Sequence, residues 1–557
     1  MPDHFYFRLY STLILFWISM LVISPDNANA QHHTDWSYNL GMYEVNIRQY
    51  TEEGTFDAFV EHLDRLEEMG VGILWLMPIH PIGEENRKGT LGSYYSVKDF
   101  KDTNPEFGSL DDFENLVQEA HDRGMYVLMD WVPNHTAWDN YLTEDHPEFY
   151  ETDGDGNFII PPGTDWSDVI QLDHDEPGLL DYMVEAMQFW IEDFGIDGFR
   201  FDAVSHADDD FLEDLNKELL EIRSDLLLLA ENDGPHWHDL GYHQSFGWGL
   251  YGFGGGILRD LVFDNADATR LYNYAEQQLE EYPEEDYRLF FTQNHDENSW
   301  EGTSEQLFGD AAEIFKIVTA IIPGMPLIYS GQEAGLDKQL EFFEKDEIEW
   351  RDHPNEEIYT RLLYLKRDNR ALWNGAAGGG ISRIGTSNES DVLAFLRKKE
   401  EDEVVVLLNL SEEEQTFTLN GEELDGDYRN LFNDEMVDLT EEDEFTLSAW
   451  DYKVFETSDT DTYAEGEDSP EEFELVQNYP NPFNATTEIS FSVPETDHVT
   501  LEVYDLQGRR ITTLVDEVRS SGTHTLSFDA ADYASGMYLY RLETSDYIQT
   551  RKMMLVK

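Results

Sequence analysis

Continuous apolar runs recur between residues 41 and 329, and amphipathic stretches of helical period separate them. Such runs are typical of strands that are buried on both faces of a parallel sheet. With about eight strand–helix units in about 320 residues, the pattern predicts an α/β protein built on a (β/α)8 barrel rather than an open doubly wound sheet. The strands that can be assigned directly lie at 41–45, 72–76, 125–130, 197–202, 226–230, 288–291 and 326–329.

A chain of 557 residues is too long for one ordinary domain. We expect the barrel at 31–373, interrupted after its third strand by a loop subdomain at 135–173 that is rich in Gly, Pro, Asp and aromatic residues. Short alternating strands predict an all-β domain at 374–457. An acidic linker at 456–470 then leads to a last β domain at 471–557.

The first residues have the pattern of a secretory signal peptide. Arg8 precedes the apolar run 13–23, and Ala-Asn-Ala at 28–30 is a small-residue cleavage site, so we expect removal of residues 1–30. The run is short for a membrane span, although an uncleaved anchor is the alternative. No other stretch is apolar enough to cross a bilayer, and we expect no membrane span in the mature protein.

The amino-acid composition is strongly acidic. Lys and Arg number 35 against 118 Asp and Glu, which gives a formal net charge of −83. Nucleic acid is excluded as a partner because phosphate binding needs clustered cations. The carboxylates are either ordinary solvated surface or an adaptation to high salt, which screens their mutual repulsion. The absence of cysteine excludes disulfides and thiolate zinc sites.

Several acids follow the predicted strands. Arg200 and Asp202 point to the same side of one strand, where the cation is expected to hold Asp202 ionised. Glu231, Asp130 and Asp296 end three other apolar runs. A barrel gathers its strand ends at one face, so these side chains are predicted to form one site.

A pair of carboxylates at a barrel rim suits glycoside hydrolysis, in which one acid attacks and the other donates a proton. The sequence shows no Ser-His-Asp order, phosphate-binding loop or His-rich metal spacing that would favour another chemistry. The Asn and His residues near these acids suit a neutral polyhydroxyl ligand.

Residues 35–457 resemble glycoside hydrolase family 13, the α-amylase family. Four short segments carry the resemblance, in the family's order: DWVPNH (130–135), GFRFDAVSH (198–206), AE (230–231) and NHD (294–296). The resemblance implies that Asp202 is the nucleophile, that Glu231 is the acid/base, and that Asp296 holds sugar hydroxyls. Glu221 and Asp233 are the rival proton donors.

The resemblance also implies a set of substrate-binding residues. Tyr95 matches a tyrosine that stacks on the sugar, with Tyr94 as its rival. The remaining matches are His135, Arg200, His206 and His295. Tryptophans that can stack on glucose, or can simply pack within the core and loops, are Trp131, Trp166, Trp237, Trp248 and Trp300.

A structural calcium is a further implication of the resemblance. Asn134 and Asp173 match its usual ligands, with the backbone oxygen of His206. The segment VIQLD (169–173) departs from the family at Gln171, where an acidic or basic residue is common. The sequence is therefore compatible both with a protein that binds calcium and with one that does not.

The tail at 471–557 resembles the C-terminal sorting domain of type IX secretion. The matching segments are QNYPNPFN (477–484), VYDLQGR (503–509) and SGMY (535–538). This resemblance implies the type IX machinery as a partner and a secreted or cell-surface location. A carbohydrate-binding module is the competing interpretation, but the tail lacks an obvious row of exposed aromatic residues.

Three functions remain open at this point. The first is hydrolysis of α-1,4 bonds in starch-like glucans, and the second is a cyclomaltodextrinase, maltogenic or transglycosylating activity of the same family. The third is a non-catalytic glucan-binding surface protein, which predicts the loss of an acid at 202, 231 or 296, yet all three acids are present. Endo or exo action is not fixed by the sequence, and a monomer is the working expectation.

Overall fold

The computed structural model describes residues 34–457 except 253–255, 264, 421–423, 425–426 and 440–443. Between 474 and 555 it describes the strands named below and residues 483, 494, 509, 530, 533, 544 and 547. The chain divides into two compact units, 1–457 and 458–557. The signal peptide expected at 1–30 and nearly all of the expected linker at 456–470 lie outside the described residues.

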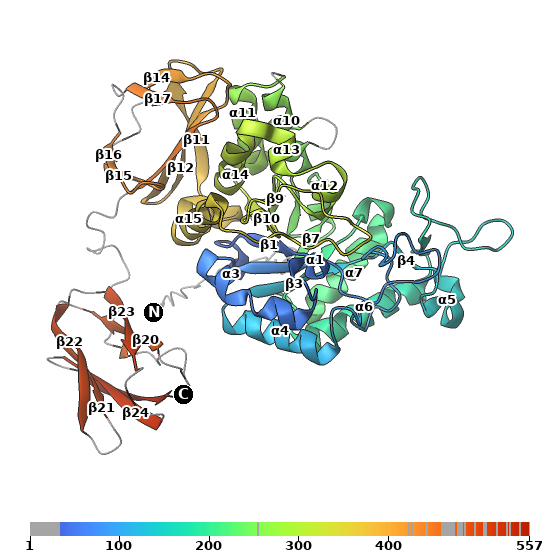
Figure 1. The fold of residues 1–557 in the computed structure, drawn as a ribbon, viewed down its shortest axis with the longest axis horizontal. Helices are drawn as coiled ribbons and strands as arrows, with labels where there is room; N and C mark the ends of the chain where they lie inside the picture. The colour runs from blue at the N-terminus through green and yellow to red at the C-terminus, as the bar shows by residue number, and fades with distance from the viewer. Residues whose placement is uncertain are drawn as a thin grey trace, which may run out of the picture. The chain divides into compact units, whose positions relative to one another are not determined.

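Eight parallel strands close into a barrel in the first unit, in the order β1-β10-β9-β8-β7-β6-β3-β2. Figure 1 shows β1, β7, β9 and β10 at the centre of this unit, so the predicted barrel is confirmed. The strands are β1 (Met42–Val45), β2 (Ile73–Leu76), β3 (Tyr126–Trp131), β6 (Gly198–Phe201), β7 (Leu227–Ala230), β8 (Gln244–Phe246), β9 (Tyr287–Phe290) and β10 (Met325–Tyr329).

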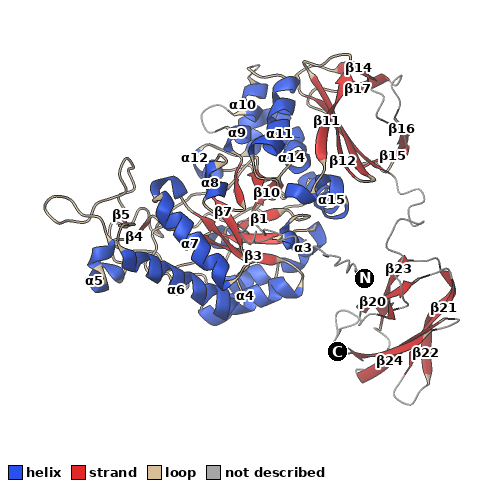
Figure 2. Cartoon of the chain, turned by 180° about the vertical axis from the view of Figure 1, so that it is seen from behind, coloured by secondary structure: helices blue, strands red, loops and turns tan. Residues whose placement is uncertain are grey.

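Helices cover the outside of the barrel, as the blue ribbons around the red strands show in Figure 2. The helix α4 shows why they form. Ser109 and Asp112 make a capping box at its start, and Phe113, Leu116 and Val117 form a buried stripe at helical spacing. The helices of ten or more residues are α4 (Leu110–Asp122), α6 (Pro177–Phe194), α7 (Asp209–Ile222), α11 (Ala268–Glu281), α14 (Ala312–Ile321) and α15 (Pro354–Asp368).

Shorter helices fill the loops between the strands. Most of them hold one or two turns, so their place depends on packing rather than on helical propensity. They are α1 (Ile47–Tyr50), α2 (Phe56–Val60), α3 (Leu63–Met69), α5 (Leu142–Asp145), α8 (His236–Asp239), α9 (Trp248–Tyr251), α10 (Ile257–Val262), α12 (His295–Trp300) and α13 (Ser304–Phe308).

An antiparallel pair of strands follows β3, in the segment where the sequence predicts an inserted loop subdomain. It consists of β4 (His135–Ala137) and β5 (Val169–Gln171), with His135 opposite Gln171. This pairing brings the start of the insertion and its end together beside the barrel rim.

The last part of the first unit is an eight-stranded antiparallel sheet in the order β16-β15-β18-β13-β12-β11-β14-β17. Leu393 and Phe395 of this sheet share one hydrophobic core with Phe315 of α14. The strands are β11 (Gly380–Thr386), β12 (Val392–Lys399), β13 (Asp402–Asn409), β14 (Gln415–Asn420), β15 (Asp427–Asn430), β16 (Met436–Asp438), β17 (Glu444–Leu447) and β18 (Tyr452–Thr457).

The second unit contains a three-stranded sheet, β19-β20-β23, and a four-stranded sheet, β22-β21-β24-β25. Phe491 of one sheet and Leu501 of the other belong to the same core, as in a β-sandwich. The strands are β19 (Glu474–Leu475), β20 (Thr486–Val493), β21 (Asp497–Tyr504), β22 (Arg510–Arg519), β23 (Gly522–Asp529), β24 (Gly536–Glu543) and β25 (Ile548–Leu555). Within the described part of the whole chain, no helix has the length and apolarity that a membrane crossing requires.

Candidate active site

A pocket with a volume of about 530 Å³ lies at the carboxyl ends of the barrel strands. Asp202, Glu231 and Asp296 all line it, together with Tyr95 and His135. Asp202 comes directly after β6 and Glu231 directly after β7, as the sequence predicts. The barrel therefore brings the three predicted acids to one cavity.

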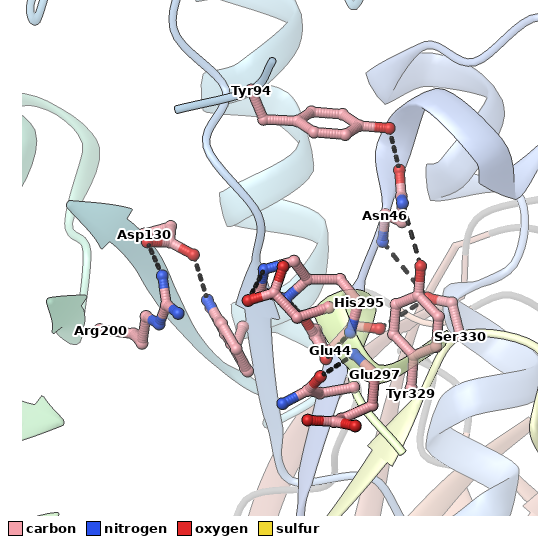
Figure 3. Close-up of polar contacts among 12 residues, drawn as sticks. Glu44, Asn46, Tyr94, Asp130, Arg200, His295, Glu297, Tyr329 and Ser330 are labelled. Carbon is pink, nitrogen blue, oxygen red and sulfur yellow. Dashed lines mark hydrogen bonds and ion pairs between the residues drawn. The ribbon is translucent and has the colours of Figure 1, made fainter. Parts of the chain in front are cut away.

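The guanidinium of Arg200 contacts three carboxyl groups of this site. The Arg200 side chain is fully buried in β6, and its Nη1 lies 2.8 Å from Asp130 Oδ1 (Figure 3). The same Nη1 lies 3.1 Å from Asp202 Oδ1. Its Nη2 lies 2.5 Å from Glu231 Oε1. A buried cation needs such compensation, because its desolvation costs several kcal/mol. The same guanidinium fixes the positions of three carboxyl groups.

The turn after β6 links the two principal acids. Ala203 has a φ of 45°, a left-handed conformation that is uncommon for a residue with a side chain. Its backbone N–H donates to Glu231 Oε2 at 2.7 Å. The residue that follows Asp202 therefore holds the carboxyl of Glu231.

The protonation of Asp202 is set by opposing effects. Burial and the nearby carboxyl of Glu231 raise the pKa of Asp202 well above its ordinary value, and Arg200 lowers it only in part. The expected contact between Arg200 and Asp202 is present, but burial and the Glu231 carboxyl oppose its effect on the pKa of Asp202.

Tyr95 lies in the pocket and Tyr94 does not. The Tyr95 hydroxyl is 2.8 Å from His295 Nε2, and it donates to Asp130 Oδ2 at 3.1 Å. The Tyr94 hydroxyl instead donates to Asn46 Oδ1 at 3.0 Å, away from the acids (Figure 3).

Glu44, in β1, is a residue of this site that the sequence analysis missed. Its side chain is fully buried, and its Oε1 lies 2.5 Å from His295 Nδ1 (Figure 3). Burial lowers the pKa of His295, but the carboxyls of Asp296 and Glu44 outweigh it and raise this pKa to about 9. The His295 imidazole is thus a cation at neutral pH. An acid inside the apolar run 41–45 was the signal that could have identified Glu44.

Asp296 comes from a helix rather than from a strand end. β9 ends at Phe290, and Asp296 lies in the first turn of α12, which the side chain of Asn294 caps by accepting from Glu297 N. Asp296 Oδ2 lies 3.6 Å from His295 Nε2, and Asp296 Oδ1 accepts from Trp300 Nε1 at 3.3 Å. The N-terminal turn of a helix favours a carboxylate.

Trp166 packs against both His135 and His206. Ring centroids are 5.4 Å apart for His135 and Trp166, and 5.1 Å apart for Trp166 and His206. Burial lowers the pKa of His135 to about 3, so its imidazole is neutral. His206 is exposed and is not among the residues that line the pocket.

The proposed calcium ligands do not form an oxygen-rich cluster. Asn134 Oδ1 accepts a hydrogen bond from Gln171 Nε2 at 2.9 Å. Asp173 is half-buried, and its Oδ1 accepts from Asp175 N. Calcium takes six to eight oxygen ligands, and the described residues contain no group of three or more His, Cys, Asp or Glu that could hold a metal ion. In this arrangement an amide N–H of Gln171 points at Asn134 Oδ1, and calcium binding at these residues stays a prediction.

The remaining candidates are the rival proton donors and the tryptophans, and they differ in whether they line the pocket. Glu221 is exposed on α7, and Asp233 Oδ1 lies 2.6 Å from Arg288 Nη2, so neither rival of Glu231 lines the pocket. Trp131 and Trp237 are buried, whereas Trp166 and Trp300 line the pocket. Trp248 packs against Phe246 and Phe291.

Comparison with protein families identifies three regions. Residues 25–160 match the family described as alpha amylase, catalytic domain. Residues 383–454 match the C-terminal domain of maltogenic amylase. Residues 477–557 match the secretion system C-terminal sorting domain.

Individual relatives give the same picture. Alpha-amylase 2 of Dictyoglomus thermophilum is 25% identical over 420 residues, which cover 70% of this chain and 69% of that protein. The maltogenic alpha-amylase of Bacillus acidopullulyticus is 23% identical over 461 residues, which cover 77% of this chain and 75% of that protein.

Solved structures include a noncanonic maltogenic alpha-amylase from Thermotoga neapolitana, with a TM-score of 0.65, 27% identity, and coverage of 75% of this chain and 96% of that one. The structure of an alpha-amylase from Lactobacillus plantarum matches with a TM-score of 0.67 and 26% identity. This match covers 76% of this chain and 100% of that one. The chain is therefore a glycoside hydrolase whose residues 25–160 match the α-amylase catalytic domain, and its tail is a type IX sorting domain that directs it to secretion or cell-surface attachment.

Proposed function

We propose that the chain is a retaining hydrolase of α-1,4-glucosidic bonds in starch and maltooligosaccharides. One observation carries the proposal: Asp202 and Glu231 contact the same buried guanidinium, that of Arg200, and face one pocket. Two carboxyl groups held on one side chain are positioned to act on a single sugar residue.

In the first step, Asp202 attacks the anomeric carbon, and a glycosyl–carboxylate bond forms as the glycosidic C–O bond breaks. Glu231 gives its proton to the departing oxygen. In the second step, a water molecule attacks the same carbon, Glu231 takes a proton from it, and Asp202 leaves as the carboxylate. The cycle needs Asp202 ionised and Glu231 protonated at its start.

The surrounding groups hold the sugar and stabilise its developing charge. Asp296, on α12, lines the pocket and is placed to accept hydrogen bonds from sugar hydroxyls, whereas the His295 cation contacts Glu44 and the hydroxyl of Tyr95. Hydrogen bonds of this kind strengthen as the oxocarbenium-like transition state forms. We propose that the enzyme acts as a monomer, which light scattering of the purified protein tests.

The test compares starch digestion by the parent enzyme with digestion by Asp202→Asn, and uses Glu221→Gln as the control, because Glu221 is an exposed acid on α7. We expect turnover to be abolished in Asp202→Asn and unchanged in the control. NMR of the first products should show the α-anomer. Initial release of the β-anomer, or full activity of Asp202→Asn, would overturn the proposal.

A maltogenic or cyclodextrin-degrading activity is the second candidate. The match of 383–454 to the C-terminal domain of maltogenic amylase favours it. Such an enzyme gives one dominant small product and prefers β-cyclodextrin to starch. Glucan binding without any turnover would instead identify a non-catalytic surface protein.

A further inference from the structure

Trp300 is an exposed aromatic side chain in an unusual place. It is 56% exposed, and among the large hydrophobic side chains that the described residues leave exposed, it is the one that lines the pocket. Leaving an indole in water forfeits most of the free energy that its burial would contribute. An exposed indole at the edge of a sugar pocket therefore suggests a ligand that covers it.

The ring of Trp300 continues a row of aromatic side chains that begins on the pocket floor. Tyr95, nearly buried, and Phe342, half-buried, lie almost parallel, with centroids 6.3 Å apart and an interplanar angle of 8°. Phe342 and Trp300 follow, with centroids 5.4 Å apart. The row runs from the buried tyrosine beside His295 to the exposed rim.

Backbone and side-chain hydrogen bonds hold this row in place. The Phe342 carbonyl accepts from Arg48 Nη1 at 3.2 Å, and the next carbonyl, that of Phe343, accepts from Leu91 N at 3.1 Å. At the rim, the indole N–H of Trp300 donates to Asp296. A surface that is already ordered loses little conformational entropy when it binds a ligand.

We infer that Phe342 and Trp300 extend the stacking surface of Tyr95, so that these three side chains form a stacking platform for consecutive glucose units of the bound chain. The C–H groups on the face of a pyranose ring are apolar and carry partial positive charge, and the face of an aromatic ring is its negative side. The platform extends binding beyond the sugar at the cleaved bond, so longer glucans are favoured. This inference rests on the proposed function.

The test measures kcat/KM for maltooligosaccharides of increasing length. Trp300→Ala should lower kcat/KM about tenfold for the longest substrates and little for the shortest. Trp300→Phe keeps an aromatic face and loses the N–H group, so it should retain the preference for long chains. Phe263→Ala is the control, because Phe263 is 61% exposed and does not line the pocket.

An equal loss at every chain length in both Trp300 variants would overturn the platform, because it would show that Trp300 acts only by positioning Asp296. A parent enzyme that turns over no α-glucan would contradict the proposed function instead. In that case, calorimetric binding of maltoheptaose decides the platform, which predicts weaker binding by Trp300→Ala than by Trp300→Phe. Equal binding by the two variants would overturn it.

Discussion

Among the buried arginines of the first unit, Arg200 and Arg397 have opposite surroundings. Arg200 is in contact with three carboxyl groups at the pocket. Arg397, in β12, makes its hydrogen bonds to the backbone carbonyls of Ile321, Gly379 and Gly380. Both side chains are almost fully buried, but one cation organises acids and the other ties the C-terminal sheet to the end of α14.

The electrostatic consequences differ accordingly. The carboxylates of Asp130 and Glu231 outweigh burial and keep the pKa of Arg200 above its ordinary value. Burial lowers the pKa of Arg397 to about 9, so this guanidinium stays charged at neutral pH with carbonyl dipoles as its partners. The acids around Arg200 belong to the site, whereas the carbonyls around Arg397 belong to the framework that joins the sheet to α14. The following experiments test that distinction.

The largest expected effect is on activity. Arg200→Gln removes the contact shared by Asp130, Asp202 and Glu231, so kcat/KM on soluble starch should fall about a thousandfold, the upper range for loss of one positioned donor. Urea unfolding of the same variant shows whether it is folded. Activity within tenfold of the parent would remove the basis for separating the two arginines.

The matching change at the other arginine should affect stability. Arg397→Met leaves several buried carbonyls without a donor and should lower the free energy of unfolding by about 3 kcal/mol. The kcat per folded molecule should be unchanged. Arg370→Met is the control, because the Arg370 side chain is 55% exposed and pairs with Glu400, a surface contact worth at most about 1 kcal/mol. Equal destabilisation by the two variants would contradict the proposed role of the carbonyl contacts.

A smaller effect is expected from Glu44→Gln, which keeps the shape of the side chain and removes its charge. With the pKa of His295 near 9 in the parent, activity that needs the cation should fall as the pH rises through about 9. Without the charge of Glu44, that fall should occur at a lower pH. Asp296, Arg200 and Tyr95 also face the imidazole, and they are unchanged in this variant.

The same pair contributes to stability with a defined sign. Folding raises the pKa of His295 above its ordinary value of 6.5, so the contribution is complete below pH 6.5 and is lost as the pH rises through about 9. The free energy of unfolding, measured between these values, should decline less in Glu44→Gln than in the parent. An identical pH profile for the two proteins would contradict the role of Glu44.

The surface charge offers a test by salt rather than by mutation. A net charge of −83 repels itself in dilute buffer, and molar salt screens that repulsion. We expect the midpoint of urea unfolding to rise from low salt to molar NaCl. A protein that is equally stable in low salt would show that the carboxylates are ordinary solvated surface.

The smallest expected effect is that of a chelator. Gln171 donates to Asn134 Oδ1, where a cation would otherwise bind, so EDTA should leave the Tm unchanged. Calcium binding at Asn134 and Asp173 stays a prediction from family resemblance. A lower Tm in EDTA, restored by calcium, would establish it and would require the Gln171 amide to move.

The main chemistry of the site could be predicted from the sequence because strand alternation and apolar runs leave few alternatives. The run 226–230 makes Glu231 the first residue beyond a buried strand, and the two-residue spacing places Arg200 beside Asp202. Both relations involve residues that are close together in the sequence, so they can be recognised without knowledge of the tertiary structure.

Other features depend on contacts between distant segments. The strand β8 is short and begins with two polar residues, Gln244 and Ser245, so no apolar run marks it. Glu44 and His295 are 251 positions apart, and only barrel closure brings them together. The contact of Gln171 with Asn134 likewise requires the pairing of β4 with β5.

The left-handed turn at Ala203 has a mechanical consequence for the reaction. Its peptide group belongs to the chain segment that carries Asp202, and its N–H holds Glu231. A displacement of the backbone at this turn is therefore transmitted to the carboxyl of Glu231 as well as to Asp202. A substitution that alters the turn disturbs the attacking group and the proton donor together, although it removes neither of them.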